Sequence, residues 1–408
     1  MSGYTLACQR CETSVADGVR CPSCGGVSST RYGVPAQAAW DAAARLPGIW
    51  RYAPVLPVAR PGEAVTLGEG GTPLVRSRRL AQAIGVRELW FKVEAANPTG
   101  SYKDRIAAVA VTRAVEAGRR GWLATSSGNA GAALAAYGAR AGLPGIVVVP
   151  ANAAPAKLAQ IRAYGPRLIP VEGFGLSAGA DAAVFATLEA ASVEHGLALS
   201  ITAHAFDPHA MDGAKTIAYE VAEQLGCVPD RVYVPAGGGG LATSLARGFR
   251  EWCDLGRAEW LPTLTVVQAE GCAPIVRSWE RGTDLVPVDA VDTAISGVQL
   301  ASPPDGDALL SALRADDGAA VGVSDDAALW AQARLAGEEG IFVEPAAALA
   351  YAGLLADLAA GRVDGDDAIV CVLTGSGFKD RDAVERMAAR RSPAAPIPID
   401  ALAAALGG

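Results

Sequence analysis

Short apolar runs alternate with longer alanine-rich segments through most of this chain. The apolar runs are rich in β-branched and aromatic residues and cover 89–93, 121–125, 145–149, 167–171, 231–235, 263–267 and 368–373. Segments long enough for crossover helices lie at 103–117, 129–141, 155–163, 214–225, 241–252, 324–339 and 345–359. Continuous apolar strands that alternate with helices predict parallel sheets covered on both faces. The number of strands favours two α/β domains over one sheet.

Composition and charge narrow the class of protein. The chain has 408 residues, of which 51% are hydrophobic and 19% charged, so it can bury large cores without disulfides or metals. Its formal net charge of −8 argues against general nucleic-acid binding. No apolar run reaches the roughly 18 residues of a membrane span, and no secretory signal is visible at the start. We therefore expect a cytoplasmic protein that acts on a small molecule, with no nucleic-acid or membrane partner.

Four cysteines form two C-x-x-C pairs near the start of the chain. The pairs are Cys8 with Cys11 and Cys21 with Cys24. Two such pairs bring four thiolates around one tetrahedral cation, typically Zn²⁺, and predict a structural zinc-ribbon-like module. The alternatives are a disulfide pair in an exported protein and a ribbon without its metal. The scattered remaining cysteines are expected to be buried apolar side chains: Cys227, Cys253, Cys272 and Cys371.

A lysine stands at the junction of a predicted strand and a predicted helix. The strand ends at Val93, a Pro98–Gly100 turn follows, and the helix begins near Ser101, so Lys103 lies in the first helical turn. The positive end of the helix dipole favours the neutral form of that amine. Only a neutral amine attacks a carbonyl carbon, so the position suits a Schiff-base lysine. A surface lysine at a helix start is the alternative.

Small polar residues follow the strand predicted at 121–125. Ser126, Ser127 and Asn129 precede an alanine-rich helix. The free backbone N–H groups of a helix start, together with two hydroxyls, suit a carboxylate or a ring oxygen. An ordinary N-cap is the alternative, because serine and asparagine are preferred there.

Four consecutive glycines separate the strand predicted at 231–235 from the next helix. They are Gly237, Gly238, Gly239 and Gly240. Glycines at such a turn let backbone N–H groups converge on a phosphate. Gly237, Gly239 and Ala242 also fit the dinucleotide pattern G-x-G-x-x-A, with Glu270 as the acidic residue, but Glu270 lies farther along the chain than the usual spacing of about 20 residues. A dinucleotide-binding oxidoreductase therefore stays an alternative.

Hydroxyl residues and glycines follow the strand predicted at 368–373. Thr374 and Ser376 are placed to hydrogen-bond a heteroaromatic nitrogen. A hydroxyl would leave such a nitrogen neutral, whereas a carboxylate would hold it protonated. A capped loop is the alternative.

Taken together and in this order, these segments resemble the threonine synthase family of fold-type II pyridoxal-phosphate (PLP) enzymes, which is related in fold to the tryptophan synthase β subunit. The resemblance covers about residues 5–390. Besides the cysteine pairs it includes LGEGGTPL (67–74), NPTGSYKDR (97–105), SSGNAGAALAAYGARAGL (126–143), MDGAKTIAYEV (211–221), VPAGGGGL (234–241), QAEGCAPIV (268–276), GIFVEPAAALA (340–350) and LTGSGFKD (373–380).

The resemblance implies the architecture of the whole chain. It implies an α/β protein with two parallel-sheet domains of PLP fold type II and an N-terminal zinc-ribbon-like module, and a homodimer is the family expectation. The implied parts are a module at 1–34, a linker at 35–65, a large PLP-binding domain at 66–111 and 203–391, a small α/β domain at 112–202 and a tail at 392–408.

The resemblance also implies roles for the candidate residues. Lys103 would bind PLP as a Schiff base and then move protons, Asn129 would bond the 3-hydroxyl, and Thr374 would face the pyridine nitrogen. Gly237 to Gly240 would cradle the phosphate of PLP, while Ser126, Ser127 and Asn129 would hold the substrate. The implied reaction converts O-phospho-L-homoserine and water to L-threonine and phosphate.

Three departures keep other substrates open. Many threonine synthases have a threonine where this chain has Ala130, and an arginine where it has Ala210, and four glycines replace a Gly-Asn loop, as in threonine dehydratases and serine racemases. A substrate phosphate without a partner would lose several kcal/mol of recognition. Candidates for replacement charge are Lys157, Arg162, Lys215 and Lys379. The alternatives within the cofactor class are β-elimination on threonine or serine and β-replacement on O-phosphoserine, as in cysteate synthase. His204 is a further candidate to reach the pocket.

Overall fold

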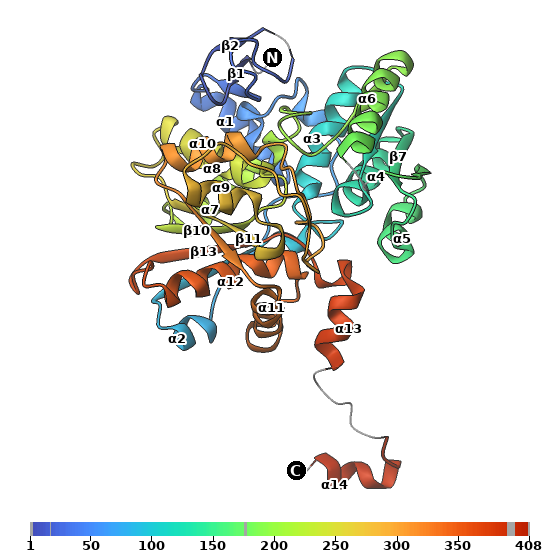
Figure 1. Cartoon of the computed structure of the whole chain (residues 1–408). Coiled ribbons are helices and arrows are strands. Elements are labelled where there is room, and N and C mark those ends of the chain that lie inside the picture. The colour runs from blue at the N-terminus through green and yellow to red at the C-terminus, as the bar shows by residue number, and fades with distance from the viewer. Residues whose placement is uncertain (1–2, 17, 175–177, 390–395, 407–408) are drawn as a thin grey trace.

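In the part of the chain that the structure describes, the strands form three sheets. The computed structural model describes residues 3–16, 18–174, 178–389 and 396–406. Within these residues the sheets have six, four and three strands. Figure 1 shows the two larger sheets among their helices and the three-stranded N-terminal sheet at the top of the molecule.

The six-stranded sheet is parallel except at one edge. Across the sheet the strands are β12 (Ala319–Val323), β11 (Thr263–Ala269), β10 (Arg231–Pro235), β13 (Ala368–Leu373), β5 (Glu88–Val93) and β4 (Leu74–Arg76). The pairs from β12 to β5 are parallel, and β4 pairs antiparallel with β5. The apolar runs predicted β5, β10, β11 and β13. They missed β4, which is three residues long, and β12, whose sequence AAVGV lacks a strong apolar run.

Strand β13 shows why its sequence is continuously apolar. Val370 and Val372 belong to one hydrophobic core, and Ile369, Cys371 and Leu373 belong to another. Because successive side chains of a strand point to opposite faces, each face of the sheet contributes to its own core. The sheet is therefore covered on both sides, as the sequence predicted.

The four-stranded sheet is parallel throughout. Its order is β8 (Arg167–Val171), β7 (Gly145–Pro150), β6 (Gly121–Thr125) and β9 (Leu197–Leu199). The sequence predicted β6, β7 and β8 and missed the three-residue β9. All its strands lie between residues 121 and 199, so this sheet is formed by one continuous stretch of chain.

The helices fall into groups around these sheets (Figure 1). The helices α3 (Lys103–Glu116), α7 (Asp212–Leu225) and α8 (Gly240–Asp254) pack together in the core that includes Val370, and α11 (Asp325–Glu339) and α12 (Pro345–Ala359) pack in the core on the other face. The helices α4 (Asn129–Ala141), α5 (Pro155–Ala163) and α6 (Ala178–His195) accompany the four-stranded sheet. Of the remaining helices, α2 (Leu80–Ile84) and α9 (Pro274–Arg281) contact strands of the six-stranded sheet. Helix α10 (Gly306–Ala315) contacts α8, and α13 (Arg381–Ala389) contacts α11.

The N-terminal sheet is a small antiparallel unit. Strands β2 (Ser14–Val15), β1 (Tyr4–Cys8) and β3 (Ser28–Tyr32) lie side by side in that order. Two side chains of β3 join the unit to the helices below it, because the hydroxyl groups of Thr30 and Tyr32 donate to the carboxylate of Asp212 on α7. The small sheet is thus tied to the main body by buried polar contacts.

The segment predicted as an irregular linker is largely packed against the main body. It contains α1 (Gln37–Ala43) and two 3₁₀ helices, η1 (Gly48–Val55) and η2 (Pro61–Glu63). Trp50 and Tyr52 are 1% exposed and belong to the same core as α3 and α7. The prolines prevented a regular periodic pattern, but the aromatic residues among them anchor the segment.

The C-terminal segment and the four cysteines outside the N-terminal pairs lie in different environments. Of the predicted tail at 392–408, residues 392–395, 407 and 408 lie outside the described residues, and η6 (Ile399–Ala401) and α14 (Leu402–Leu406) lie apart from the main body in Figure 1. Cys272 and Cys371 are buried as predicted, but Cys227 is exposed and Cys253 half-buried, so that prediction was wrong for both. Within the described residues, no helix has the length and apolarity to cross a membrane.

Candidate active site

Lys103 is the first residue of α3 and stands where the turn after β5 ends. Gly100 has a φ of 89°, and its N–H donates to the Asn97 carbonyl at 2.8 Å, which closes the turn. The half-buried amine of Lys103 donates to the Thr202 hydroxyl at 2.8 Å and lies 4.7 Å from the centroid of the Tyr102 ring. The amine is therefore held in place by a neutral hydroxyl group.

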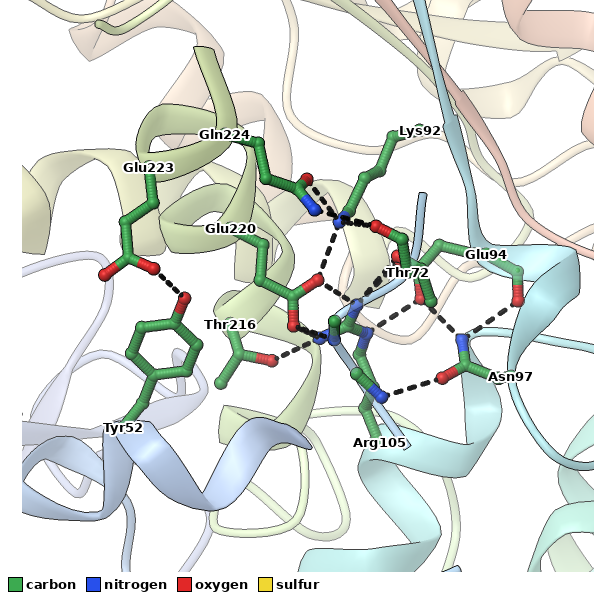
Figure 2. Close-up of polar contacts among 12 residues, drawn as sticks. Tyr52, Thr72, Lys92, Glu94, Asn97, Arg105, Thr216, Glu220, Glu223 and Gln224 are labelled. Atoms are coloured by element: carbon green, nitrogen blue, oxygen red, sulfur yellow. Dashed lines mark hydrogen bonds and ion pairs between the residues drawn. The ribbon is translucent and has the colours of Figure 1, made fainter. Parts of the chain in front are cut away.

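Directly behind this lysine lies a buried ionic cluster, drawn in Figure 2. Arg105 donates to both oxygens of Glu94 at 2.8 Å and to both oxygens of Glu220 at 2.7 Å. Lys92 donates to Glu220 at 2.6 Å. Burial raises the pKa of Glu220, but Arg105 and Lys92 outweigh it and hold that pKa well below its usual range, at about 2. Two positive and two negative side chains meet here, so the cluster fixes the loop without a large net charge.

The loop after β13 lies against the loop that carries Lys103. The Tyr102 N–H donates to the Thr374 carbonyl at 3.0 Å, and the Ser376 N–H donates to the Gly100 carbonyl at 2.9 Å. Strands β5 and β13 are parallel neighbours, so their carboxyl ends meet at one edge of the sheet. The structure therefore brings Thr374 and Lys103, far apart in sequence, to one place.

Asn129, the first residue of α4, contacts a carboxylate that the sequence analysis did not single out. Its amide nitrogen lies 3.1 and 3.3 Å from the two carboxylate oxygens of Glu344. The Glu344 N–H donates to the Gly375 carbonyl at 3.0 Å, and a Cβ on Gly375 would lie 2.3 Å from Glu344 Oε1. Burial raises the pKa of Glu344 to about 7. Asn129 is thus joined, through Glu344, to the loop of Thr374.

Ser126 and Ser127 lie between β6 and α4 and are half-buried. The Ser126 hydroxyl accepts from the Gly128 N–H at 3.2 Å, so it supports the turn that precedes the helix. A Cβ on Gly131 would lie 2.2 Å from the Ser126 carbonyl oxygen, which explains the glycine in the first turn of α4. The two serines are next to Asn129 in the chain and share its helix start.

The tetraglycine loop, residues 237–240, connects β10 to α8 and fits a phosphate group. Gly239 has a φ of 88°, and among the described residues the N–H groups of Gly237, Gly238 and Gly239 have no protein acceptor. These free N–H groups lie at the start of a 15-residue helix, a ready position for an anion. A Cβ on Gly240 would lie 3.6 Å from the Thr202 carbonyl oxygen, and the Thr202 hydroxyl bonds Lys103, so Thr202 joins the loop to the lysine.

The four N-terminal cysteines gather at one point. Their Sγ atoms lie within 4.8 Å of one another, with Cys8–Cys24 and Cys11–Cys24 separations of 3.4 Å and a Cys11–Cys21 separation of 3.7 Å. Sulfur atoms at about 2.3 Å around a tetrahedral Zn²⁺ would be about 3.8 Å apart. A Cβ on Gly26 would lie 2.9 Å from Cys8 Sγ, so a glycine is needed beside the cluster. The donor set fits a tetrahedral cation.

The candidates for replacement charge separate into three groups. Lys215 is fully buried in an ion pair with Glu251 at 2.7 Å, so it is committed elsewhere. Lys157 and Arg162 are exposed on α5. The half-buried Lys379 donates to Gln160 at 2.7 Å, and a Cβ on Gly100 would lie 3.1 Å from its Cε. Of the four, Lys379 is therefore the one in contact with the lysine loop.

Sequence reasoning gave no role to several residues of this region. Thr202 lies after a strand too short to detect, and Glu344 is an isolated acid in an apolar segment, a signal that could have been used. His204, a candidate for the pocket, is fully buried and bonds to Asp305 beneath the tetraglycine loop. Ala130 is half-buried and Ala210 is 1% exposed, and the methyl side chain of alanine supplies no polar group at either position.

The class of protein that this site defines is a PLP enzyme. Its features are a lysine at a helix start, a glycine loop suited to phosphate, and hydroxyl residues at the same sheet edge. The family model described as pyridoxal-phosphate dependent enzyme matches residues 65–375. The structure is similar to the processed threonine deaminase isoform 2 of Solanum lycopersicum (TM-score 0.65, 24% identity, 78% of this chain and 82% of that chain). It is also similar to a threonine deaminase of T.th. (TM-score 0.61, 28% identity, 84% and 98%). These neighbours place the chain in the α/β fold of type II PLP enzymes.

Relatives identify the family more closely. The chain is 40% identical to threonine synthase of Methanosarcina acetivorans over 83% of its length and 82% of the relative. It is 41% identical to threonine synthase of Methanocaldococcus jannaschii over 83% and 82% of the two chains. This chain belongs to the threonine synthase family of PLP-dependent enzymes. The resemblance found in the sequence is confirmed, and the dinucleotide-binding alternative is set aside.

Proposed function

We propose that this enzyme converts O-phospho-L-homoserine and water to L-threonine and phosphate, with Lys103 as the catalytic residue. The observation that carries the proposal is the position of the Lys103 amine, bonded to Thr202 between the tetraglycine loop and the loop of Thr374. When bound, PLP supplies an electron sink for carbon acids. The similarity to relatives named threonine synthase supports the same reaction.

The residues around Lys103 suit the parts of the cofactor. Lys103 would hold the aldehyde carbon, the N–H groups of Gly237 to Gly240 would hold the phosphate, and Thr374 would face the pyridine nitrogen. Asn129 would bond the 3-hydroxyl with its amide, which Glu344 orients from the other side. Each of these contacts uses a group that the fold already holds in place.

The protein's own groups would manage the protons of the reaction. Ser126, Ser127 and Asn129, at the start of α4, would hold the substrate carboxylate. The freed Lys103 amine would take the proton from Cα and return protons later in the sequence. A second proton leaves Cβ, phosphate leaves Cγ, the oxygen of water adds at Cβ, and Cγ gains a proton to become the methyl group.

The substrate phosphate needs a cation, and Lys379 is the best placed of the candidates. Burial lowers the pKa of Lys379, and its amine bonds to the neutral Gln160. An amine without a carboxylate partner in direct contact is available to a dianion. Lys379 would therefore replace the polar groups missing at Ala130 and Ala210.

Ala130 and Ala210 favour a second candidate reaction among PLP enzymes. Without a phosphate partner on α4 or before α7, the site would suit β-elimination on threonine or serine, or β-replacement on O-phosphoserine. A test compares initial rates of phosphate release from O-phosphohomoserine with keto-acid release from threonine and serine and with sulfite-dependent phosphate release from O-phosphoserine. Phosphate together with stoichiometric threonine supports the first reaction, and keto acid as the dominant product would contradict it.

The N-terminal cluster is proposed to hold structural Zn²⁺. Cys8, Cys11, Cys21 and Cys24 would fill all four positions of a tetrahedral site, which leaves no position for chemistry. Metal analysis should find one zinc per chain, and Cys8→Ser with Cys11→Ser should remove it. Freshly purified protein without zinc would contradict this assignment. The expected cytoplasmic homodimer stays a prediction.

A further inference from the structure

A buried carboxylate supports the tetraglycine loop from below. Asp305 is fully buried, and its N–H donates to the Gly238 carbonyl at 3.1 Å. A Cβ on Gly240 would lie 2.8 Å from Asp305 Oδ2, and a Cβ on Gly239 would lie 3.2 Å from the Asp305 carbonyl. Asp305 therefore contacts the loop through its backbone and its side chain, and it is one reason why these positions are glycine.

His204 holds that carboxylate. The Asp305 carboxylate accepts from the backbone N–H groups of His204 at 2.8 Å and Ala205 at 2.9 Å. The ring atom Nδ1 of His204 lies 3.2 Å from Asp305 Oδ2, and Nε2 lies 3.4 Å from Nη1 of Arg247. A guanidinium group only donates, so Nε2 accepts and Nδ1 carries the proton. In this arrangement Nδ1 donates to Asp305.

Arg247 continues the contacts to the N-terminal sheet. On α8, its Nη2 donates to the carbonyl of Thr30 at 2.9 Å and to the hydroxyl of Thr30 at 3.0 Å. Its Nη1 donates to Asp212 at 3.0 Å, and the same carboxylate accepts from the hydroxyl of Tyr32 at 2.6 Å. The N-terminal cysteine module consists of the sheet β2-β1-β3 and its four cysteines. Thr30 and Tyr32 belong to β3, so the contacts extend from this module into the main body.

We propose that His204 is a positioning residue that couples the N-terminal cysteine module to the tetraglycine loop. Thr30 holds Arg247, and Arg247 contacts one side of the His204 ring. The other side of the ring contacts Asp305, and Asp305 contacts the loop. The consequence for the cofactor rests on the proposed function, in which this loop holds the phosphate of PLP. The module is then part of what shapes the cofactor site, although its cysteines lie far from Lys103 in the sequence.

The test compares three single variants of the full chain. His204→Ala removes the ring contacts with Asp305, Arg247 and Ser244, and His204→Asn keeps a donor near the Nδ1 position. His195→Ala is a matched control at the exposed end of α6. Amide hydrogen exchange of residues 236–243 is measured in cofactor-free protein, and the Kd of PLP is measured by titration. We expect His204→Ala to speed exchange and to weaken PLP by about tenfold, a usual size for coupling between sites. His204→Asn should recover part of both effects, and His195→Ala should change neither.

A second variant perturbs the N-terminal end of the same contacts, and it keeps the test possible if His204→Ala does not fold. Thr30→Val with Tyr32→Phe leaves the tetraglycine loop and its neighbours unchanged, and we expect faster exchange of 236–243 and PLP binding weakened about threefold. Unchanged exchange in this variant and in a folded His204→Ala would overturn the coupling. Faster exchange with an unchanged PLP Kd supports the coupling and contradicts the proposed role of the loop in holding phosphate.

Discussion

Lys103 and Arg105 are two residues apart in one helix and meet opposite environments. Lys103 is half-buried, and among the described residues its amine makes one hydrogen bond, to the Thr202 hydroxyl. Arg105 is fully buried and makes six, to Glu94, Glu220, Thr72 and Thr216. Two residues rotate about 200° around a helix, so one motif serves two sides of α3. The front offers an available amine, and the back fixes the loop that presents it.

The two sides also differ in how they treat carboxylates. Behind the loop, Arg105 and Lys92 hold Glu220 ionised. In front, burial raises the pKa of Glu344 to about 7, and its partner Asn129 is neutral. A charge that is paired with cations stabilises a scaffold, whereas a carboxyl that titrates near neutrality is typical of a functional region.

The largest effect on activity is expected from substitution of Lys103. Lys103→Ala should lower kcat by at least about 10³-fold, because it removes the group proposed to hold the cofactor and to carry the protons. Lys103→Arg keeps the charge but not a nucleophilic amine, and should be as inactive. Thermal unfolding should place both variants within about 1 kcal/mol of the parent. Turnover retained in either variant would contradict the assignment of Lys103 to the catalytic side of α3.

The next largest effect is expected from Arg105, and it is a loss of stability instead of a loss of activity. Arg105→Met leaves Glu94 and Glu220 with too few partners in a buried site, so the free energy of unfolding should fall by about 3–5 kcal/mol. Arg119→Met, on an exposed arginine just after α3, should change it by less than about 0.5 kcal/mol. Equal denaturant midpoints for the two variants would remove the distinction between front and back.

The smallest effect is a pH dependence. The pKa of Glu344 is higher in the folded protein than its unfolded value near 4.3, so the folded state binds the proton more tightly. Its contribution to stability is complete below about pH 4 and is lost as the pH rises through about 7. Glu344→Gln lacks this loss, so relative to the parent it should gain roughly 2–3 kcal/mol between pH 5 and pH 8.

A carboxylate on α11 provides the control for that prediction. Burial raises the pKa of Glu339, but hydrogen bonds from Ser77 and from the backbone N–H groups of residues 78–80 outweigh it and lower that pKa. Its contribution is therefore lost as the pH falls, and Glu339→Gln should lose stability relative to the parent between acid and neutral pH. Parallel pH profiles for the two variants would show that the Glu344 environment is not as described.

Much of the scaffold follows from local patterns in the sequence. The strand β6 and the helices α4 and α5 begin and end where the apolar runs and alanine-rich segments predicted. Continuous apolar residues and glycine-containing turns are sufficient for this, because both depend on neighbours in the chain. The short strands β4 and β9 were missed, since three residues do not establish a period.

The site was predictable only in part, for a related reason. Lys103 and the tetraglycine loop can be recognised in the sequence because they follow predicted strands, and ligands bind at strand ends in open α/β sheets. Thr202 and Asp305 carry no local signal, and their importance comes from contacts across about 100 residues of sequence. The buried state of Lys215 was equally hidden, since its partner Glu251 lies one helix away.

The most direct test of the account is to identify the lysine that binds PLP. The protein is reduced with borohydride in the presence of its cofactor, digested, and the modified peptide is sequenced by mass spectrometry. The account predicts a pyridoxyl group on Lys103 alone, with loss of the visible absorbance band. A label on Lys379 or another lysine, with Lys103 unmodified, would contradict it.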